Sequence, residues 1–313
     1  MQYDQFFSGE YQVEQIIDRS QYSVLCLGKR SAGGQQVLIR LWLTAQPTSE
    51  EQDRIREEVA ALQQVEHPYL LPILGMQADQ QKVFLVSAYA PAGSLNALLA
   101  QETREAFSLE KALQIIDQTG QALSALHKQG IVHGNLTPQA IFFTEPGQVQ
   151  LGEYLLRSVL VSIQDYQHIL DENAPRCLYM APEQFRGTLD TKTDQYALGC
   201  LAYLLLTGRV PFAGSARATL LQKHQRDTPQ TLLALNPAIP EHIEAAVLKA
   251  LAKEPEERHE SIEAFVEKLD IPGHKVMADL ATMKHPTPAL AAGAAGTDES
   301  LWEWEVSLPP EGP

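Results

Sequence analysis

The chain has 313 residues, and its 24 Lys plus Arg against 39 Asp plus Glu give a formal net charge of −15. This charge repels phosphate backbones and anionic lipid, so it argues against nucleic-acid and membrane-surface binding. With 44% hydrophobic and 20% charged residues, the composition excludes wholesale disorder and predicts a globular protein with a sizeable core.

The three cysteines indicate a reducing compartment. Cys26, Cys177 and Cys200 are odd in number, lie far apart and form no CxxC pair, which argues against a disulfide or zinc framework. Residues 1–10 lack the basic and apolar pattern of a signal peptide, and the longest apolar run, 196–206, is too short to cross a bilayer. We therefore expect a soluble cytoplasmic protein with no membrane span.

In chain order, the first predicted elements are strands. Runs rich in β-branched and aromatic residues predict strands at 22–27, 36–42 and 82–89. One helix interrupts them: it opens with Thr48 and Glu51 at capping-box spacing. Its apolar residues recur at helical spacing and form one stripe, made of Ile55, Val59, Leu62 and Val65.

Beyond residue 91 the pattern becomes mainly helical. Helices are predicted at 109–127, 193–206, 240–253 and 261–269, with short β-like segments at 140–143 and 149–151. A run of strands followed by a run of helices is typical of an α+β protein. We expect a lead-in, a small β-rich lobe with one helix, and a larger helical lobe, over 1–10, 11–90 and 91–272.

The last part of the chain has a different composition. Pro, Ala and Gly dominate from about residue 286, which predicts a flexible linker and an acidic tail over 273–313. In that tail Trp302 and Trp304 alternate with glutamates. This strip could add as a strand to a partner's sheet, fold back on the domain, or remain a disordered acidic segment.

Several motifs occur in a fixed order over about residues 11–270. They are Val37-Leu38-Ile39-Arg40, His67-Pro68, His133-Gly134-Asn135-Leu136-Thr137-Pro138, Met180-Ala181-Pro182-Glu183, Thr193-Asp194-Gln195-Tyr196-Ala197-Leu198-Gly199 and the stretch 205–212. Together they resemble the protein kinase family, particularly the bacterial serine/threonine kinases of eukaryotic type. The resemblance implies a two-lobed fold with the nucleotide between the lobes.

The nucleotide site implied by the resemblance is altered. Asp18, Ser20 and Ser23 stand where kinases have the three glycines of the phosphate-binding loop, so side chains would hold the loop away from phosphates. The alternative is an ordinary β-hairpin with solvated polar residues. Arg40 replaces the phosphate-binding lysine, and Glu58 matches its helix partner. We expect a structural Arg40–Glu58 ion pair, because guanidinium and ammonium groups differ in geometry.

Strand alternation predicts that the adenine site is filled. Leu38 and Arg40 share a face, so Leu38 points into the cleft if Arg40 does. In the family, alanine usually takes the Leu38 position against the adenine ring, and Phe142 matches the residue beneath it. We expect the two side chains to meet and to replace the nucleotide base. In the alternative, both rotate aside and leave a usable pocket.

The catalytic loop implied by the resemblance lacks its reacting groups. Asn135 stands at the position of the catalytic aspartate and has no carboxylate, a loss on the order of 10² to 10⁴ in rate for a general base. Thr137 has no positive charge for the transferring phosphate, and Ala140 has no oxygen for Mg²⁺. Glu153 keeps a carboxylate at the metal-binding position, and it could hold Mg²⁺ or be a solvated glutamate.

Other matching positions belong to the scaffold of the fold. By resemblance, four residues form the apolar stack that joins the lobes, Glu183 and Arg258 form a buried ion pair, and Asp194 anchors the catalytic loop. The stack residues are His133, Tyr154, Leu62 and Ile73.

These observations favour a pseudokinase that binds a signalling protein or another kinase and needs no cofactor. One alternative is a serine/threonine kinase with residual activity, in which Glu153 holds Mg²⁺ and Arg40 holds the phosphates of ATP. The other is a module that binds a different small ligand in the cleft between the lobes.

Overall fold

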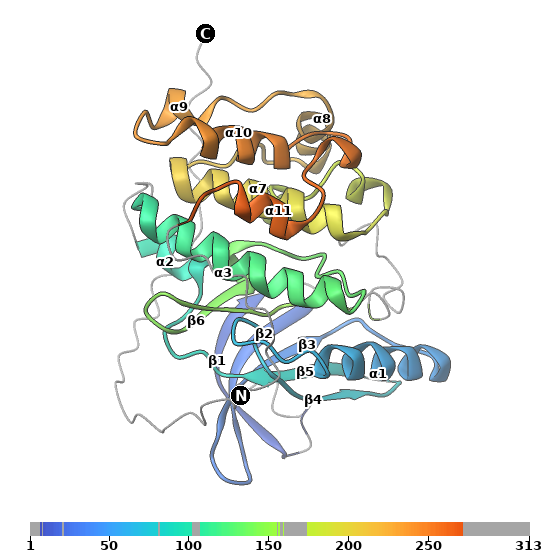
Figure 1. Ribbon diagram of the computed structural model, residues 1–313. Helices are drawn as coiled ribbons and strands as arrows, with labels where there is room; N and C mark the ends of the chain where they lie inside the picture. The colour runs from blue at the N-terminus through green and yellow to red at the C-terminus, as the bar shows by residue number, and fades with distance from the viewer. Residues whose placement is uncertain are drawn as a thin grey trace. The chain divides into compact units, whose positions relative to one another are not determined.

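An antiparallel five-stranded sheet forms the small lobe, in the order β1-β2-β3-β5-β4 (Figure 1). The computed structural model describes residues 7, 9–20, 22–80, 82–101, 107–154, 156, 159 and 174–271. The expectations for the linker and for Trp302 and Trp304 lie outside these residues. The strands are β1 (Tyr11–Arg19), β2 (Ser23–Arg30), β3 (Gln36–Trp42), β4 (Ile73–Ala78) and β5 (Val83–Ala88).

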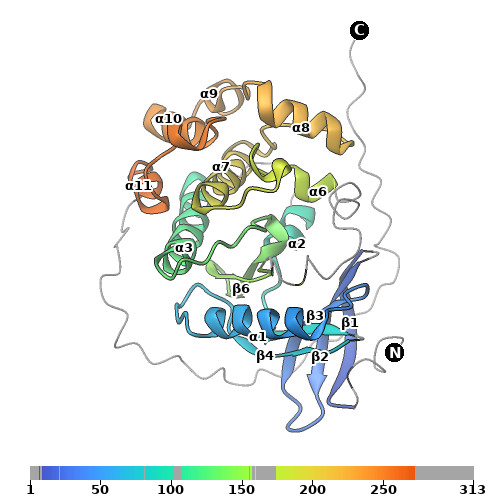
Figure 2. The ribbon, with the colours of Figure 1, turned by 90° about the vertical axis from the view of Figure 1, so that its right-hand side faces the viewer.

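Helix α1 (Ser49–Gln63) packs against this sheet beside β4 (Figure 2). The predicted capping box is confirmed: the Thr48 hydroxyl accepts the Glu51 N–H, and the Glu51 carboxylate accepts the Thr48 N–H. The predicted stripe is confirmed at Ile55, Val59 and Leu62, which are buried against the sheet, while Val65 follows the end of the helix.

The large lobe is mainly helical. Its central helix α7 (Thr191–Thr207) is buried almost all round, as its apolar sequence predicts. The other helices are α2 (Leu95–Gln101), α3 (Leu109–Lys128), α6 (Ala174–Cys177), α8 (Arg217–Arg226), α9 (Leu232–Leu235), α10 (Glu241–Ala250) and α11 (Ile262–Glu267). Short 3-10 helices lie at Pro138–Ala140, Gln184–Arg186 and Pro255–Glu257.

A two-stranded sheet lies on the side of the large lobe that faces the small one. It pairs β6 (Ile141–Glu145) with β7 (Gln148–Leu151), and Phe142 is opposite Gln150. Main-chain bonds tie it to the small lobe: the Leu71 N–H donates to the Leu151 carbonyl and the Leu151 N–H to the Tyr69 carbonyl, each at 2.8 Å. The catalytic-loop residues that precede β6 are thereby fixed relative to the sheet.

The sequence missed several elements with weak patterns. Strand β1 buries Tyr11 and Val13, but its other apolar residues, Ile16 and Ile17, are adjacent and not buried, which breaks the alternation. Strand β4 contains Gly75 and is largely half-exposed, so it shows no clean alternation either. Helices α2 and α8 were also not predicted. Within the described part of the chain, no helix has both the length and the apolarity that crossing a bilayer requires.

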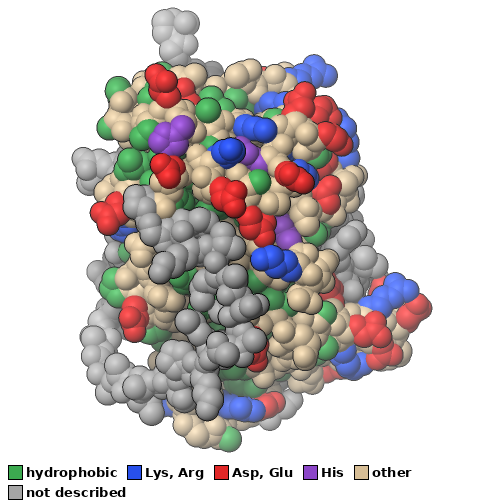
Figure 3. Space-filling view, in the orientation of Figure 1, with side chains coloured by type: hydrophobic (Ala, Val, Ile, Leu, Met, Phe, Trp, Pro, Cys, Tyr) green, Lys and Arg blue, Asp and Glu red, His purple; other side chains and the backbone are tan. Residues whose placement is uncertain are grey.

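Acidic and basic side chains are interspersed on the face of the molecule that Figure 3 shows. On this face the net negative charge is therefore not gathered into one large acidic patch.

Candidate functional site

The turn between β1 and β2 is a hairpin closed by its own polar groups. The Ser20 N–H donates to the Ser23 carbonyl at 2.9 Å, and the Ser20 hydroxyl accepts the N–H groups of Tyr22 and Ser23 at 3.2 and 3.1 Å. These contacts are those of a side-chain-stabilised turn. The segment that contains Asp18, Ser20 and Ser23 is therefore a hairpin, in which these three residues are half-buried.

Arg40 on β3 points into the cleft between the lobes. Its guanidinium forms an ion pair with Glu153, lies 3.5 Å from the Asp18 carboxylate and donates to the Ser23 hydroxyl at 3.2 Å. Burial lowers the pKa of Arg40, but the carboxylates of Glu153 and Asp18 outweigh this and raise it above its usual value. Arg40 therefore remains a cation whose partners come from its own chain.

The predicted Arg40–Glu58 ion pair is wrong. Glu58 is half-buried on α1, and the two carboxylates paired with Arg40 are those of Asp18 and Glu153. The physical reason is the backbone at Glu153, whose φ of 59° places it in the left-handed region. This conformation and the longer arm of glutamate bring the carboxylate across the cleft to the guanidinium.

Asn135 faces the backbone that carries Glu153. The Asn135 side-chain amide donates to the Glu153 carbonyl at 2.9 Å, and the Asn135 N–H donates to Nδ1 of His133 at 3.2 Å. Thr137 and Ala140 are both buried, and the Ala140 N–H donates to the Thr137 carbonyl at 3.0 Å. These positions therefore offer an amide, a hydroxyl and a methyl group, with no carboxylate among them.

Asp194 anchors the loop that carries these residues. Its two carboxylate oxygens accept the N–H groups of His133 and Gly134, and His127 lies within hydrogen-bond distance, each at 2.8 Å. The carboxylate is 1% exposed, so these three contacts stabilise a buried charge. The resemblance assigned this anchoring position to Asp194, and the geometry agrees with it.

An apolar cluster fills the cleft beside Arg40. Leu38 on β3 and Phe142 on β6 are each 3% exposed and belong to one cluster with Leu25, Leu71 and Ala90. A Cβ added at Gly152 would lie 2.9 Å from Leu71 and 3.4 Å from the Phe142 ring, so the floor of the cluster is tightly packed as well. Leu38 and Phe142 thus come together as strand alternation predicts.

The sequence reasoning missed three members of this cluster. Leu25 lies on the same face of β2 as Ser23, so the alternation rule used for Leu38 could have found it. Leu71 and Ala90 lie in connecting segments without periodicity, and no local signal marks them.

Two members of the stack assigned by resemblance are in ring contact. The rings of His133 and Tyr154 lie 5.3 Å apart, and Leu62 and Tyr154 belong to the main apolar core, against which Ile73 packs. Burial lowers the pKa of His133, with Asp194 acting in the opposite direction, so the imidazole is neutral and lies 2.8 Å from the Gly152 carbonyl. The stack connects the two lobes through packing.

Glu183 and Arg258 form a bidentate ion pair deep in the large lobe. The two N···O distances are 2.6 and 2.8 Å, and the Arg258 side chain is 0% exposed. Its remaining N–H groups donate to the carbonyls of Lys192, Ala252 and Lys253 at 2.8 to 3.1 Å. A fully hydrogen-bonded guanidinium is the condition under which such a buried charge is tolerable.

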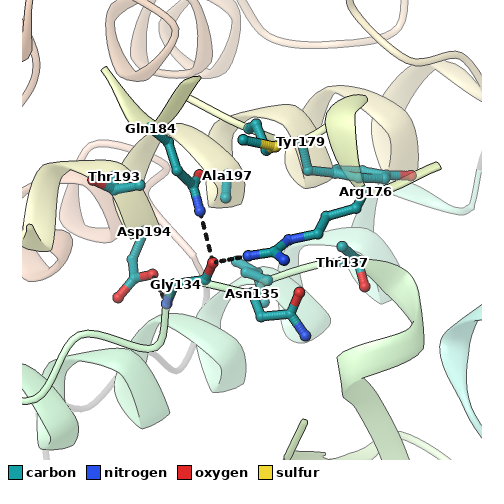
Figure 4. Close-up of a pocket in the computed structure, with 11 residues that line it drawn as sticks. Gly134, Asn135, Thr137, Arg176, Tyr179, Gln184, Thr193, Asp194 and Ala197 are labelled. Carbon is teal, nitrogen blue, oxygen red and sulfur yellow. Dashed lines mark hydrogen bonds between the residues drawn. The ribbon is translucent and has the colours of Figure 1, made fainter. Parts of the chain in front are cut away.

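A small hollow, with room for about one water molecule, lies beside the catalytic-loop positions (Figure 4). Arg176 and Gln184 both donate to the Gly134 carbonyl, at 3.3 and 2.8 Å, and Gly134 has a φ of 68°. The sequence analysis did not single out Arg176 or Gln184, because only the fold brings them to this carbonyl.

The donor set of the cleft does not fit a magnesium nucleotide. Within the described part of the chain, no group of three or more His, Cys, Asp or Glu side chains is placed to hold a metal ion. The carboxylate of Glu153 is paired with Arg40, and apolar side chains occupy the space beside them. Among the described residues, the carboxylate that could hold Mg²⁺ is therefore engaged by Arg40, and protein side chains fill the space beside it.

Comparison with known proteins identifies the family. The protein kinase domain model matches residues 11–269. The serine/threonine-protein kinase Pkn1 of Myxococcus xanthus is 30% identical over 271 residues, which cover 84% of this chain and 38% of that protein. PrkC of Bacillus subtilis is 28% identical over 261 residues, covering 82% of this chain and 39% of that protein. The chain thus spans less than two fifths of either relative.

Solved structures agree on the fold. Rad53, in a complex with AMP-PNP, superposes with a TM-score of 0.66 at 18% identity and covers 88% of this chain and 70% of that one. A mutant of the Mycobacterium tuberculosis PknI kinase domain gives a TM-score of 0.64 at 19% identity, covering 83% of this chain and 94% of that one. The chain belongs to the protein kinase family, and the curated relatives it matches include bacterial serine/threonine-protein kinases.

Proposed function

We propose that this chain is a pseudokinase, a protein kinase domain that binds a signalling protein or another kinase without transferring phosphate. The observation that carries the proposal is the apolar cluster of Leu38, Phe142, Leu25, Leu71 and Ala90. With no ligand present, each of these residues is at most 3% exposed. A nucleotide base would have to displace this packing, and tightly packed interiors resist such insertion.

The charges beside the cluster support the same function. A kinase needs a cation for the phosphates and a carboxylate for the metal, but here Arg40 and Glu153 are paired with each other. A magnesium nucleotide would first have to separate this partly buried ion pair before either group could bind it. Asn135 has no carboxylate to act as a general base, and Ala140 has no oxygen to bind a metal.

A kinase domain that binds no nucleotide can still act by binding another protein through its surface. The scaffold of Asp194, Glu183 and Arg258 is complete, so the fold can present a stable surface without nucleotide. The net charge of −15 disfavours nucleic acid as the partner, which leaves another protein. We place this role in the cytoplasm, because Cys26, Cys177 and Cys200 are free and buried thiols.

Calorimetric titration of the full chain with ATP, with and without Mg²⁺, tests the proposal. We expect no binding heat and no change in the melting temperature. A ligand that binds only the folded state stabilises it by about 2.7 kcal/mol at 100 times its dissociation constant, so thermal unfolding is a sensitive second readout. Saturable ATP binding would contradict the filled cleft.

Residual kinase activity is the second candidate, and the retained carboxylate of Glu153 favours it. In that function Glu153 would leave Arg40 and hold the metal. Incorporation of radiolabelled phosphate from ATP into a general acceptor protein, abolished by Glu153→Ala, would establish it. The exposed Glu50→Ala is the matched control, because it also removes one carboxylate. We expect no incorporation in any of the three proteins.

A further inference from the structure

Lys253 is a half-buried lysine in the large lobe, outside the cleft. It follows helix α10, and helices α8 and α10 are both at the end of this lobe that lies away from the small one (Figure 1). The Lys253 carbonyl accepts an N–H of the buried Arg258 guanidinium at 3.1 Å, and the Lys253 ammonium lies 4.2 Å from the centre of the Phe212 ring. Both ends of the residue are therefore held in place, one by a hydrogen bond and one by a cation–π contact.

The ammonium of Lys253 has few polar contacts. Its hydrogen bond to the Lys223 carbonyl is long, at 3.4 Å, and the same carbonyl also accepts the Asp227 N–H at 2.9 Å. An ammonium has three N–H donors, so two of them have no acceptor among the described residues. Within this part of the chain, Lys253 also has no carboxylate as an ion-pair partner. The protein thus stabilises the charged form of this side chain poorly.

This environment lowers the pKa of Lys253 to about 8. Burial is the main cause, and the guanidinium of Arg258 acts in the same direction, against the opposing effects of Cys200 on α7 and Asp227 after α8. His224 on α8 lies near Lys253 as well, but its imidazole is neutral at this pH. At about pH 7.5, roughly a quarter of amines with such a pKa are neutral, against about one in a thousand at the ordinary pKa of lysine.

A neutral amine is a nucleophile, whereas an ammonium has no free electron pair. Lysines become nucleophiles in proteins when apolar surroundings or a second cation favour loss of the proton. Lys253 meets both conditions, because it packs on the Phe212 ring and lies near the Arg258 guanidinium. Amines of this kind attack activated carbonyl groups, such as those of acyl phosphates and thioesters, and form stable amides.

We propose that Lys253 is a site of acylation, at which its amine accepts an acyl group from an acyl phosphate or a thioester. The amine nitrogen forms a bond to the carbonyl carbon, and the bond from that carbon to the phosphate oxygen or to the sulfur breaks. Phosphate or thiolate leaves with the electron pair, and the nitrogen loses a proton to the leaving group or to water. The product is a neutral amide, so the charge beside the Phe212 ring disappears. The inference is independent of the proposed function, because Lys253 lies outside the cleft.

The test compares acylation rates at two lysines of the full chain. The folded protein is incubated with acetyl phosphate or with acetyl coenzyme A, and the acetylated fraction at each lysine is measured by mass spectrometry after digestion. Lys249 is the internal reference, because it is exposed on α10, four residues before Lys253. At about pH 7.5 we expect Lys253 to react at least about fivefold faster, since its neutral fraction outweighs its partial burial and its lower basicity.

The dependence of the rate on pH distinguishes a nucleophilic amine from an amine that is merely accessible. The rate at Lys253 should be half-maximal near pH 8, whereas an ordinary lysine becomes half neutral only near pH 10.5. In about 6 M guanidinium chloride, which unfolds all but hyperstable proteins, the difference between Lys253 and Lys249 should disappear. The advantage of Lys253 would then be a property of the fold.

Matched variants locate the fast reaction. Lys253→Arg keeps a cation but removes the amine and should abolish it, and Lys249→Arg should leave it unchanged. If Lys253→Arg does not fold, the rates at the two lysines of the wild type decide. Reaction with one donor supports an acyl phosphate or a thioester as the source, and reaction with both supports a general acyl acceptor. Equal rates at Lys253 and Lys249, or a rate at Lys253 that still rises about tenfold per unit between pH 8 and 10, would overturn the proposal.

Discussion

The cleft between the lobes and the base of the large lobe use charged residues in different ways. In the cleft, Arg40 pairs with Glu153 and lies near Asp18, and each of these groups is at least partly exposed. At the base, the guanidinium of Arg258 is fully buried and bonded to Glu183 and to three carbonyls. The difference shows that a charge fully removed from solvent has a hydrogen-bond partner at each of its nitrogen atoms, whereas the charges in the cleft keep some contact with solvent.

The largest expected effect comes from breaking the ion pair at the base. Glu183→Gln would leave the buried charge of Arg258 without its carboxylate, and the free energy of unfolding should fall by about 3–5 kcal/mol. Urea unfolding followed by circular dichroism measures this change.

The exposed pair of Glu50 and Arg54 on α1 is the control for that variant. Its side chains are 77% and 58% exposed, so Glu50→Gln should change the free energy of unfolding by less than about 1 kcal/mol. Equal effects at the two sites would show that Glu183 has no special structural role.

A somewhat smaller effect is expected in the cleft, from Leu38→Ala. Removing the buried side chain should lower the free energy of unfolding by about 3 kcal/mol through lost burial and a residual cavity. Leu41→Ala is the matched control, because Leu41 lies on the same strand but packs into a different cluster on the opposite face. Urea unfolding of Leu38→Ala and Leu41→Ala measures the change in the free energy of unfolding.

The same two variants sharpen the interpretation of the cleft. If Leu38 occupies the place of the base, ATP should raise the melting temperature of Leu38→Ala more than that of the wild type or of Leu41→Ala. A stabilisation by ATP that is the same in all three proteins would contradict a cleft closed by this side chain.

The smallest expected effect is a pH dependence of the free energy of unfolding, caused by His224 in the interior of the large lobe. His224 is buried, and Tyr196 lies 2.8 Å from its Nδ1. Burial and the nearby ammonium of Lys253 lower the pKa of His224 to about 3, against the opposing effect of the Cys177 backbone. The unfolded chain, with a pKa near 6.5, binds the proton first as the pH falls.

The contribution of neutral His224 to the free energy of unfolding is therefore fully present above about pH 6.5, and it decreases as the pH falls toward 3. At pH 5 the loss amounts to about 2 kcal/mol, from 1.36 kcal/mol for each pKa unit. Urea unfolding between pH 5 and 7.5 should show a weaker pH dependence in His224→Gln than in the wild type. His242→Gln, at an exposed position, is the control. An unchanged slope in His224→Gln would contradict a buried neutral imidazole.

The local pattern predicted the elements with strong periodicity. Strand β3 has the predicted bounds, and the capping box of Thr48 and Glu51 marks the start of α1. The alternation of side chains along β3 also predicted that Leu38 faces the cleft, and the structure has it in one cluster with Phe142. The fold class followed from the order of motifs. The strand bounds and the capping box depend on residues close together in the chain, and the order of the motifs is read directly along it.

The sequence by itself determined the family, the α+β fold and the absence of a carboxylate at Asn135, because residue type and spacing carry that information directly. Only the tertiary structure decided that Arg40 pairs with Glu153 instead of Glu58, and that Arg176 joins Gln184 at the Gly134 carbonyl. Ion pairs and pockets depend on backbone angles and on which distant segments meet, and short-range patterns do not contain either.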